Sequence, residues 1–211
     1  MDHVELITAP AAVDEMTTNY LAHLRGGDGP AFAGFFAPDR PKLAARLAEL
    51  NVGPRSSGII STFPVGSPLR HLFFGSRNKS PTDRPEHFAH ANGATSLSGV
   101  WIATSEPDTR VLLSNLGVPF ESVTLDLPAP TTVERGRLPE GEVLIIPAAR
   151  QMVAGRRIVG VTMATKSMEL VKAALSNAAP AVRDSAIARG RSVFLPPSVT
   201  HGVWIELREG R

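Results

Sequence analysis

A strand-like segment, a capping residue and a short Leu-rich helix follow one another three times in this chain. This recurrence constrains the fold more than any other feature. The three segments start at Gly34, Gly99 and Gly160, so 65 residues separate the first two starts and 61 residues separate the last two. A fixed period of this size is typical of a supersecondary unit that is used several times. We therefore expect three copies of one unit.

Each copy begins its helix with residues that suit a first turn. Asp39 precedes Pro41 in the first copy, Ser105 precedes Pro107 in the second, and Ser167 opens the third. Asp and Ser side chains accept hydrogen bonds from free helical N–H groups, and proline is tolerated where no N–H is needed. These residues place one amphipathic helix after the first strand of every copy.

Each copy also ends in a strand. We expect these closing strands over residues 69–76, 142–148 and 202–208, with a further strand over 57–63 and another hidden within 53–60. A short helix or helical loop is expected over 11–25. The opening run 3–8 resembles the closing strands, so we expect it to be the last strand of a leading unit that is incomplete.

The predicted fold is α+β, built from repeated βαβββ units. Strands outnumber helices and the links between them are short, so the sheets are expected to be mixed and mostly antiparallel, with the helices outside. Facing units would curl into a half-open barrel with a concave cleft. The predicted domains are a leading half over 1–80, a linker over 81–94 and a trailing half over 95–211.

Composition narrows the classes of partner and cofactor. Lys and Arg total 22 against 20 Asp and Glu, and the basic residues are scattered instead of forming a stripe along phosphates. Nucleic acid is therefore not an expected partner. The chain has no cysteine, so any metal would need His, Asp or Glu ligands. No glycine-rich phosphate loop is present, which argues against a nucleotide cofactor.

Neither a signal peptide nor a membrane span is expected. The amino terminus lacks a basic segment followed by a long apolar core, and no run approaches the roughly 18 apolar residues that would span a bilayer. We predict a cytoplasmic protein that does not bind membranes.

Four segments, taken with the tandem units, carry a family resemblance that covers nearly the whole chain. The sequence resembles a glyoxalase-like protein of the vicinal oxygen chelate superfamily in the opening Val4-Glu5-Leu6-Ile7, the stretch 29–36, the linker His90-Ala-Asn-Gly-Ala94 and the closing Gly202-Val-Trp-Ile-Glu-Leu207. The resemblance implies a metal held in the cleft by His, Glu or Gln side chains from the first and last strands of paired units. There the metal would polarise a small substrate with two neighbouring oxygens.

Carried over to this chain, the family pattern selects Glu5 and Glu206 as catalytic residues and metal ligands, with His3 as a third ligand. The metal would be Zn, Ni, Mn or Fe. Glu5 and Glu206 lie in equivalent closing strands, whereas the other closing strands hold apolar residues near Phe73 and Leu144, and no first strand supplies a histidine. The alternative is that both carboxylates face outward, since strand alternation alone decides the face.

Three further residues are candidates for substrate binding. His87 and His90 are three apart, a spacing found in ligand pairs, although the nearby Pro85 equally favours a turn in which they anchor the linker. Arg77 lies in a basic loop that would suit a carboxylate or phosphate group, or would simply be solvated. His71 is expected on the polar side of its strand, at the surface.

Two functions remain open, together with a structural alternative. One is a divalent-metal-dependent lyase, isomerase or dioxygenase that acts on a small oxygenated molecule. The other is a protein of the same fold that binds or sequesters a small molecule without metal. In the structural alternative, an open first unit pairs with a second copy, which predicts a homodimer.

Overall fold

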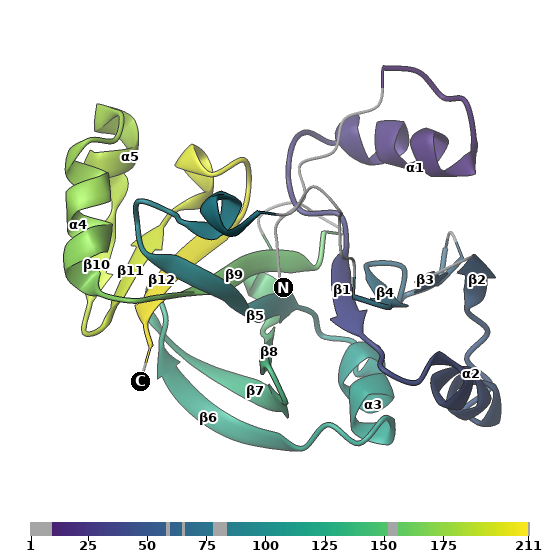
Figure 1. Cartoon of the computed structure of the whole chain (residues 1–211). Helices are drawn as coiled ribbons and strands as arrows, with labels where there is room; N and C mark the ends of the chain where they lie inside the picture. The colour runs from purple at the N-terminus through teal and green to yellow at the C-terminus, as the bar shows by residue number, and fades with distance from the viewer. Residues whose placement is uncertain (1–9, 58–59, 65, 78–83, 152–155, 211) are drawn as a thin grey trace.

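The computed structural model describes residues 10–57, 60–64, 66–77, 84–151 and 156–210. Figure 1 shows the helix α1 (Glu15–Leu24) followed by groups of strands with helices beside them. Within these ranges no helix is long and apolar enough to cross a bilayer. His3, Glu5 and residues 81–83 of the linker lie outside the described residues, and the division into domains at residues 81–94 stays a prediction.

The three predicted units are confirmed. The first comprises β1 (Ala33–Phe36), α2 (Arg40–Glu49), β2 (Arg55–Ser57), β3 (Ile60–Thr62) and β4 (Leu72–Gly75). The second comprises β5 (Ala94–Ala103), α3 (Asp108–Asn115), β6 (Phe120–Asp126), β7 (Pro130–Leu138) and β8 (Gly141–Ile146). The third comprises β9 (Ile158–Thr165), α4 (Met168–Ser176), a second helix α5 (Pro180–Ser185), β10 (Ile187–Arg189), β11 (Ser192–Leu195) and β12 (Trp204–Glu209). Of the 3-10 turns in the described residues, η1 (Pro85–Phe88) and η2 (Ala148–Arg150) lie between units, and η3 (Pro197–Val199) lies within the third unit, between β11 and β12.

Two of the three helix caps predicted from the sequence form the expected bonds, and Ser105 does not cap its helix. The Asp39 carboxylate accepts from the Lys42 amide at 2.9 Å, and the Ser167 hydroxyl accepts from the Leu170 amide at 3.2 Å. Each bond satisfies one of the amides that a helix leaves free in its first turn. α3 is different, because its cap is Pro107 and no side chain caps it.

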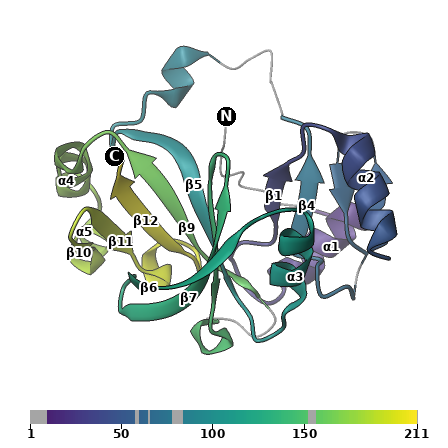
Figure 2. The same ribbon diagram turned by 90° about the horizontal axis from the view of Figure 1, so that it is seen from below.

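The strands form two mixed sheets. A four-stranded sheet has the order β1-β4-β3-β2, and an eight-stranded sheet has the order β10-β11-β12-β9-β5-β8-β7-β6. Among the described strands, only the β1–β4, β5–β8 and β9–β12 pairs are parallel. Figure 2 shows the larger sheet curled into a half-barrel with α4 and α5 on its outside. The predicted fold class is thereby confirmed.

The second and third units meet through a pseudo-twofold pairing of their first strands. β5 and β9 run antiparallel, with Gly99 opposite Thr162 and Trp101 opposite Gly160. Exchanging the two units maps each of these pairs onto the other, so Trp101 and Thr162 occupy equivalent places. Gly160 is required there, because a Cβ atom on it would lie 2.3 Å from the Trp101 ring.

Three apolar clusters hold the sheets together. One joins the smaller sheet to α3 and β5 through Leu72, Leu112 and Ile102. A second packs the outer side of the larger sheet against α4. The third fills much of the concave side and contains Trp101, Leu144 and Phe194. The concave face is therefore the one opposite to α3 and α4.

His71 does not lie on a strand surface, and this expectation was wrong. Residues 68–71 form a turn before β4, so strand alternation does not apply to them. The ring is half-buried, and its Nε2 lies 3.1 Å from the hydroxyl oxygen of Thr109 at the start of α3. Beside it, Asp108 accepts two hydrogen bonds from Arg157 at 2.8 and 2.7 Å. This cluster links the two sheets.

Acid should weaken this link. Burial lowers the pKa of His71 to about 4, and the charge of Arg157 adds to that effect, while Asp108 and a backbone hydrogen bond with Pro68 oppose it. The unfolded chain binds a proton on His71 near pH 6.5, well before the folded chain does, so the free energy of unfolding should fall as pH drops from about 6.5 to about 4. Linkage sets the loss at no more than about 3 to 4 kcal/mol.

Urea unfolding of the parent and His71→Gln at a series of pH values measures this contribution. The glutamine can still bond to Thr109 but does not titrate, so the variant should lose less stability over that interval. Equal losses in the two proteins would assign the acid sensitivity to other groups.

Candidate functional site

The carboxylate of Glu206 lies at the centre of a buried hydrogen-bond network on the concave face. The residue is 2% exposed. Its Oε1 accepts from the Ser192 hydroxyl at 2.6 Å and from Nε of Arg208 at 2.9 Å. Its Oε2 accepts from the Thr162 hydroxyl at 2.8 Å and from Nη2 of Arg208 at 2.7 Å. An ionised carboxylate offers about four acceptor positions, so these four bonds fill them.

Strand register brings these donors to one place. Successive side chains of a strand point to opposite faces, so Glu206 and Arg208 share the concave face of β12. Thr162 is the partner of Glu206 on β9, and Ser192 is the partner of Arg208 on β11. Leu207, on the opposite face of β12, joins the cluster under α4. Alternation therefore places the polar set inside the barrel.

The network extends to the second unit at both ends. The indole Nε1 of Trp101 donates to the Thr162 hydroxyl at 2.9 Å, and Nη1 of Arg208 donates to Glu142 of β8 at 2.8 Å. Burial by itself would lower the pKa of Arg208, but its hydrogen bonds and charge pairing with Glu206 and Glu142 outweigh that effect and raise it. Arg208 is thus fixed as a cation between two carboxylates.

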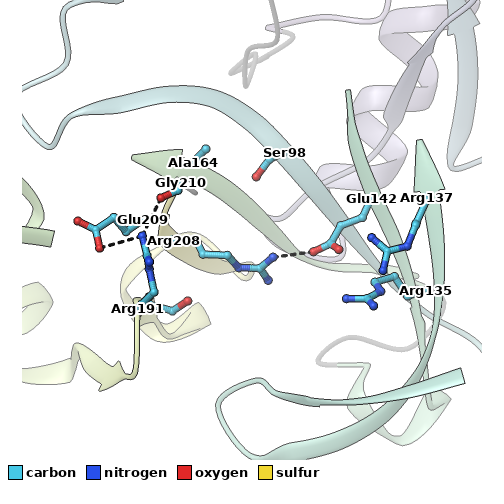
Figure 3. Close-up of a pocket in the computed structure, with 10 residues that line it drawn as sticks. Ser98, Arg135, Arg137, Glu142, Ala164, Arg191, Arg208, Glu209 and Gly210 are labelled. Carbon is cyan, nitrogen blue, oxygen red and sulfur yellow. Dashed lines mark hydrogen bonds and ion pairs between the residues drawn. The ribbon is translucent and has the colours of Figure 1, made fainter. Parts of the chain in front are cut away.

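A pocket of about 580 Å³ opens beside this network (Figure 3). Its lining contains four guanidinium groups and two carboxylates. Figure 3 shows Arg135 and Arg137 on one side, Arg191 on the other, and Arg208 reaching across to Glu142. The residues that line it are Ser98, Arg135, Arg137, Glu142, Ala164, Arg191, Ser192, Arg208, Glu209 and Gly210.

The outer arginines of this pocket, which we call the arginine pocket, are held more loosely than Arg208. Arg135 and Arg137 both donate to one oxygen of Glu121, at 2.8 to 3.0 Å. The hydrogen bond from Arg135 is the main cause that lowers the pKa of Glu121. Arg191 lies 3.3 Å from Glu209 and donates to the Gly210 carbonyl at 2.8 Å. Each guanidinium carries five donors, so several stay available to a ligand.

The structure does not bring the other described candidates to Glu206. Arg77 forms an ion pair with Glu140 and lies over the Phe36 ring, 4.5 Å from its centroid. His87 is exposed in η1, and His90 is exposed in the turn that follows. None of the three lines the arginine pocket. Glu5 and His3 lie outside the described residues, so their roles stay predictions.

Sequence reasoning missed the partners of Glu206. Arg208 is two residues further along the same strand, a spacing that puts both side chains on one face and was the available signal. Ser192 and Thr162 lie on other strands, 14 and 44 residues away. Only the pairing register of β9, β11 and β12 brings them next to Glu206.

Comparison with solved structures finds many likenesses, including the following three. The chain is 15% identical to 2,2',3-trihydroxybiphenyl 1,2-dioxygenase from Sphingomonas wittichii, with a TM-score of 0.56 over 85% of this chain and 70% of that one. It is 12% identical to a catechol 2,3-dioxygenase, with a TM-score of 0.54 over 85% and 72%. It is 16% identical to an extradiol ring-cleaving dioxygenase from B. fuscum, with a TM-score of 0.51 over 83% and 54%.

The chain has the vicinal oxygen chelate fold. Identities of 12 to 16% establish the architecture, and the activity of these dioxygenases does not follow from them. No protein-family model matches the sequence, and no curated protein matches it either.

The donor set around Glu206 does not fit the metal that this fold family implies. Pairing between first and last strands places Leu144 beside Trp101 and Glu206 beside Thr162. The four central positions therefore hold one carboxylate, one hydroxyl, one indole and one aliphatic side chain. Among the described residues no group of three or more His, Asp or Glu side chains is able to hold a metal ion. A metal at Glu206 would have to displace Arg208 or a hydroxyl.

Removing Arg208 should destabilise the protein strongly. Arg208→Ile leaves the Glu206 carboxylate buried without its cation, which typically costs about 3 to 5 kcal/mol of unfolding free energy. Arg183→Ile, which breaks an exposed pair with Asp184, is the matched control and should change the free energy of unfolding far less.

A double variant separates the ion pair from the loss of side-chain volume. Leu144 and Ile146 occupy the places in β8 that correspond to Glu206 and Arg208, so Glu206→Leu with Arg208→Ile copies the apolar half of the barrel. Denaturant unfolding should show that the double variant recovers much of the loss. If Arg208→Ile were as stable as the control Arg183→Ile, the ion pair would not stabilise the buried carboxylate.

Proposed function

We propose that the chain is a small-molecule-binding protein on the vicinal oxygen chelate fold, which takes an anionic ligand in the arginine pocket without a metal. The observation that carries the proposal is the saturation of the Glu206 carboxylate by four protein donors. The carboxylate best placed to bind a metal is thereby committed to holding Arg208.

The charge and exposure of the pocket favour an anion. Its lining holds four guanidinium groups, and each is paired with a carboxylate through only part of its N–H donors. Arg137 is 61% exposed and shares one oxygen of Glu121 with Arg135, so both keep free N–H groups. Guanidinium groups match carboxylates in planar, two-bonded geometry. Arg191 on the opposite side supplies a second anchor, which suits a ligand with two anionic groups.

Arg208 and its partners supply the rigid floor of the site. Two hydrogen bonds join Arg208 to Glu206 within β12. Thr162 of β9 and Ser192 of β11 each donate one more to Glu206, and Arg208 donates one to Glu142 of β8. A group held in place before binding loses little conformational entropy when a ligand arrives. The outer arginines then provide the adjustable contacts.

A metal-dependent lyase, isomerase or dioxygenase is the second candidate, and the fold likeness to dioxygenases favours it. It would require Glu5 and His3 to approach Glu206 and Arg208 to leave it. A cytoplasmic location, a homodimer, and the absence of nucleic-acid and membrane partners also remain predictions from the sequence.

Thermal unfolding with succinate as the probe tests the proposal. Saturating succinate in EDTA should raise the Tm by about 5 °C, because a ligand that binds only the folded state stabilises it by mass action. Replacing EDTA with Zn, Ni, Mn or Fe salts should leave the shift unchanged. Arg137→Gln and Arg191→Gln should each reduce it, whereas the surface control Arg183→Gln should not.

Three outcomes would contradict the proposal. A succinate shift that disappears in EDTA would show that a metal is needed, and it would favour the second candidate. The absence of any Tm shift at high succinate concentration would remove the arginine pocket as an anion site. A shift in Arg137→Gln and Arg191→Gln as large as in the parent protein would do the same.

A further inference from the structure

A second, smaller pocket lies on the concave face, on the other side of Trp101. Its volume is about 210 Å³. It shares only the Trp101 side chain with the buried network, since the indole nitrogen bonds to Thr162 while the ring lines this pocket. The residues that line it are Trp101, Leu127, Pro128, Ala129, Thr131, Ile146, Ala149, Arg150, Val159 and Trp204.

The walls of this tryptophan pocket are apolar and aromatic. Trp101 is 1% exposed, and Leu127, Ile146 and Val159 are also buried. Trp204 is half-buried and packs against the same cluster. Tryptophan rings present large, rigid surfaces that favour contact with other aromatic rings. A volume of about 210 Å³ is below the usual range of ligand sites, so it suits a single ring and not a nucleotide.

One cation stands at the edge of this apolar space. Arg150 in η2 is exposed and donates to the Thr131 hydroxyl at 3.2 Å, and that hydroxyl donates to the Ala129 carbonyl at 2.8 Å. Among the residues that the structure describes, no carboxylate pairs with Arg150. Arg135, Arg191 and Arg208 in the arginine pocket all have such partners. Arg150 therefore keeps donors and charge for a ligand.

We propose that the tryptophan pocket binds a single-ring aromatic carboxylate. Its ring would pack against Trp101 and Trp204, and its carboxylate would accept hydrogen bonds from the Arg150 guanidinium, which Thr131 helps to position. The positive charge of Arg150 disfavours an aromatic amine in the same place. This site is separate from the arginine pocket and does not depend on the function proposed for it.

The fluorescence of the protein itself reports on this site, because the chain has two tryptophans and both line the pocket. Benzoate should change the tryptophan emission saturably. Benzamide, which has the same shape without the charge, and cyclohexanecarboxylate, which has the charge without the flat ring, should each bind more weakly. Arg150→Gln should weaken benzoate binding roughly tenfold or more, because a charge-assisted hydrogen bond is lost.

Two control variants locate the binding. Arg183→Gln should bind benzoate with the parent's affinity, and so should Arg191→Gln, which alters only the arginine pocket. Circular dichroism should show that Arg150→Gln stays folded, since the side chain it replaces is exposed.

The proposal is overturned by an unsaturable fluorescence response, by an unchanged affinity in Arg150→Gln, or by benzamide or cyclohexanecarboxylate binding as tightly as benzoate. Weakening by Arg191→Gln instead of Arg150→Gln would place benzoate in the arginine pocket and would also overturn it. None of these benzoate results changes how the succinate test of the arginine pocket is interpreted.

Discussion

The ion pair between Glu206 and Arg208 is the interaction on which the concave face of this protein depends. A carboxylate that is almost fully removed from water is tolerated only when its acceptor positions are filled, and here two hydroxyls and one guanidinium fill them. The same guanidinium reaches Glu142, so the network ties the third unit to the second across the middle of the barrel. Both the floor of the arginine pocket and the position of Trp101 follow from it.

The second and third units, which form the barrel, have similar backbones, but one places apolar side chains inside the barrel and the other places polar ones there. Where the third unit holds Thr162 and Glu206, the second holds Trp101 and Leu144 at equivalent places. The polar half leaves a charged pocket beside the network, and the apolar half leaves a pocket walled by tryptophan. Side-chain differences on a shared backbone thus give one cleft two chemistries. This is how a fold hosts functions that its architecture does not predict.

The fold could be predicted from the sequence because its signals are local. The caps at Asp39 and Ser167 and the repeated strands fix the units before any tertiary contact is considered. The site could be predicted only in part. Alternation places Glu206 on a face, but its partners come from strands whose register the sequence does not show. His71 was misjudged because a turn replaces the strand that its alternation suggested.

The central claim is that Glu206 is a structural acceptor and not a metal ligand, and a crystal structure grown with Zn²⁺ tests it most directly. We predict that its oxygens remain 2.6 to 2.9 Å from the donors on Thr162, Ser192 and Arg208. A zinc ion within about 2.2 Å of a Glu206 oxygen, with Arg208 displaced, would contradict the account.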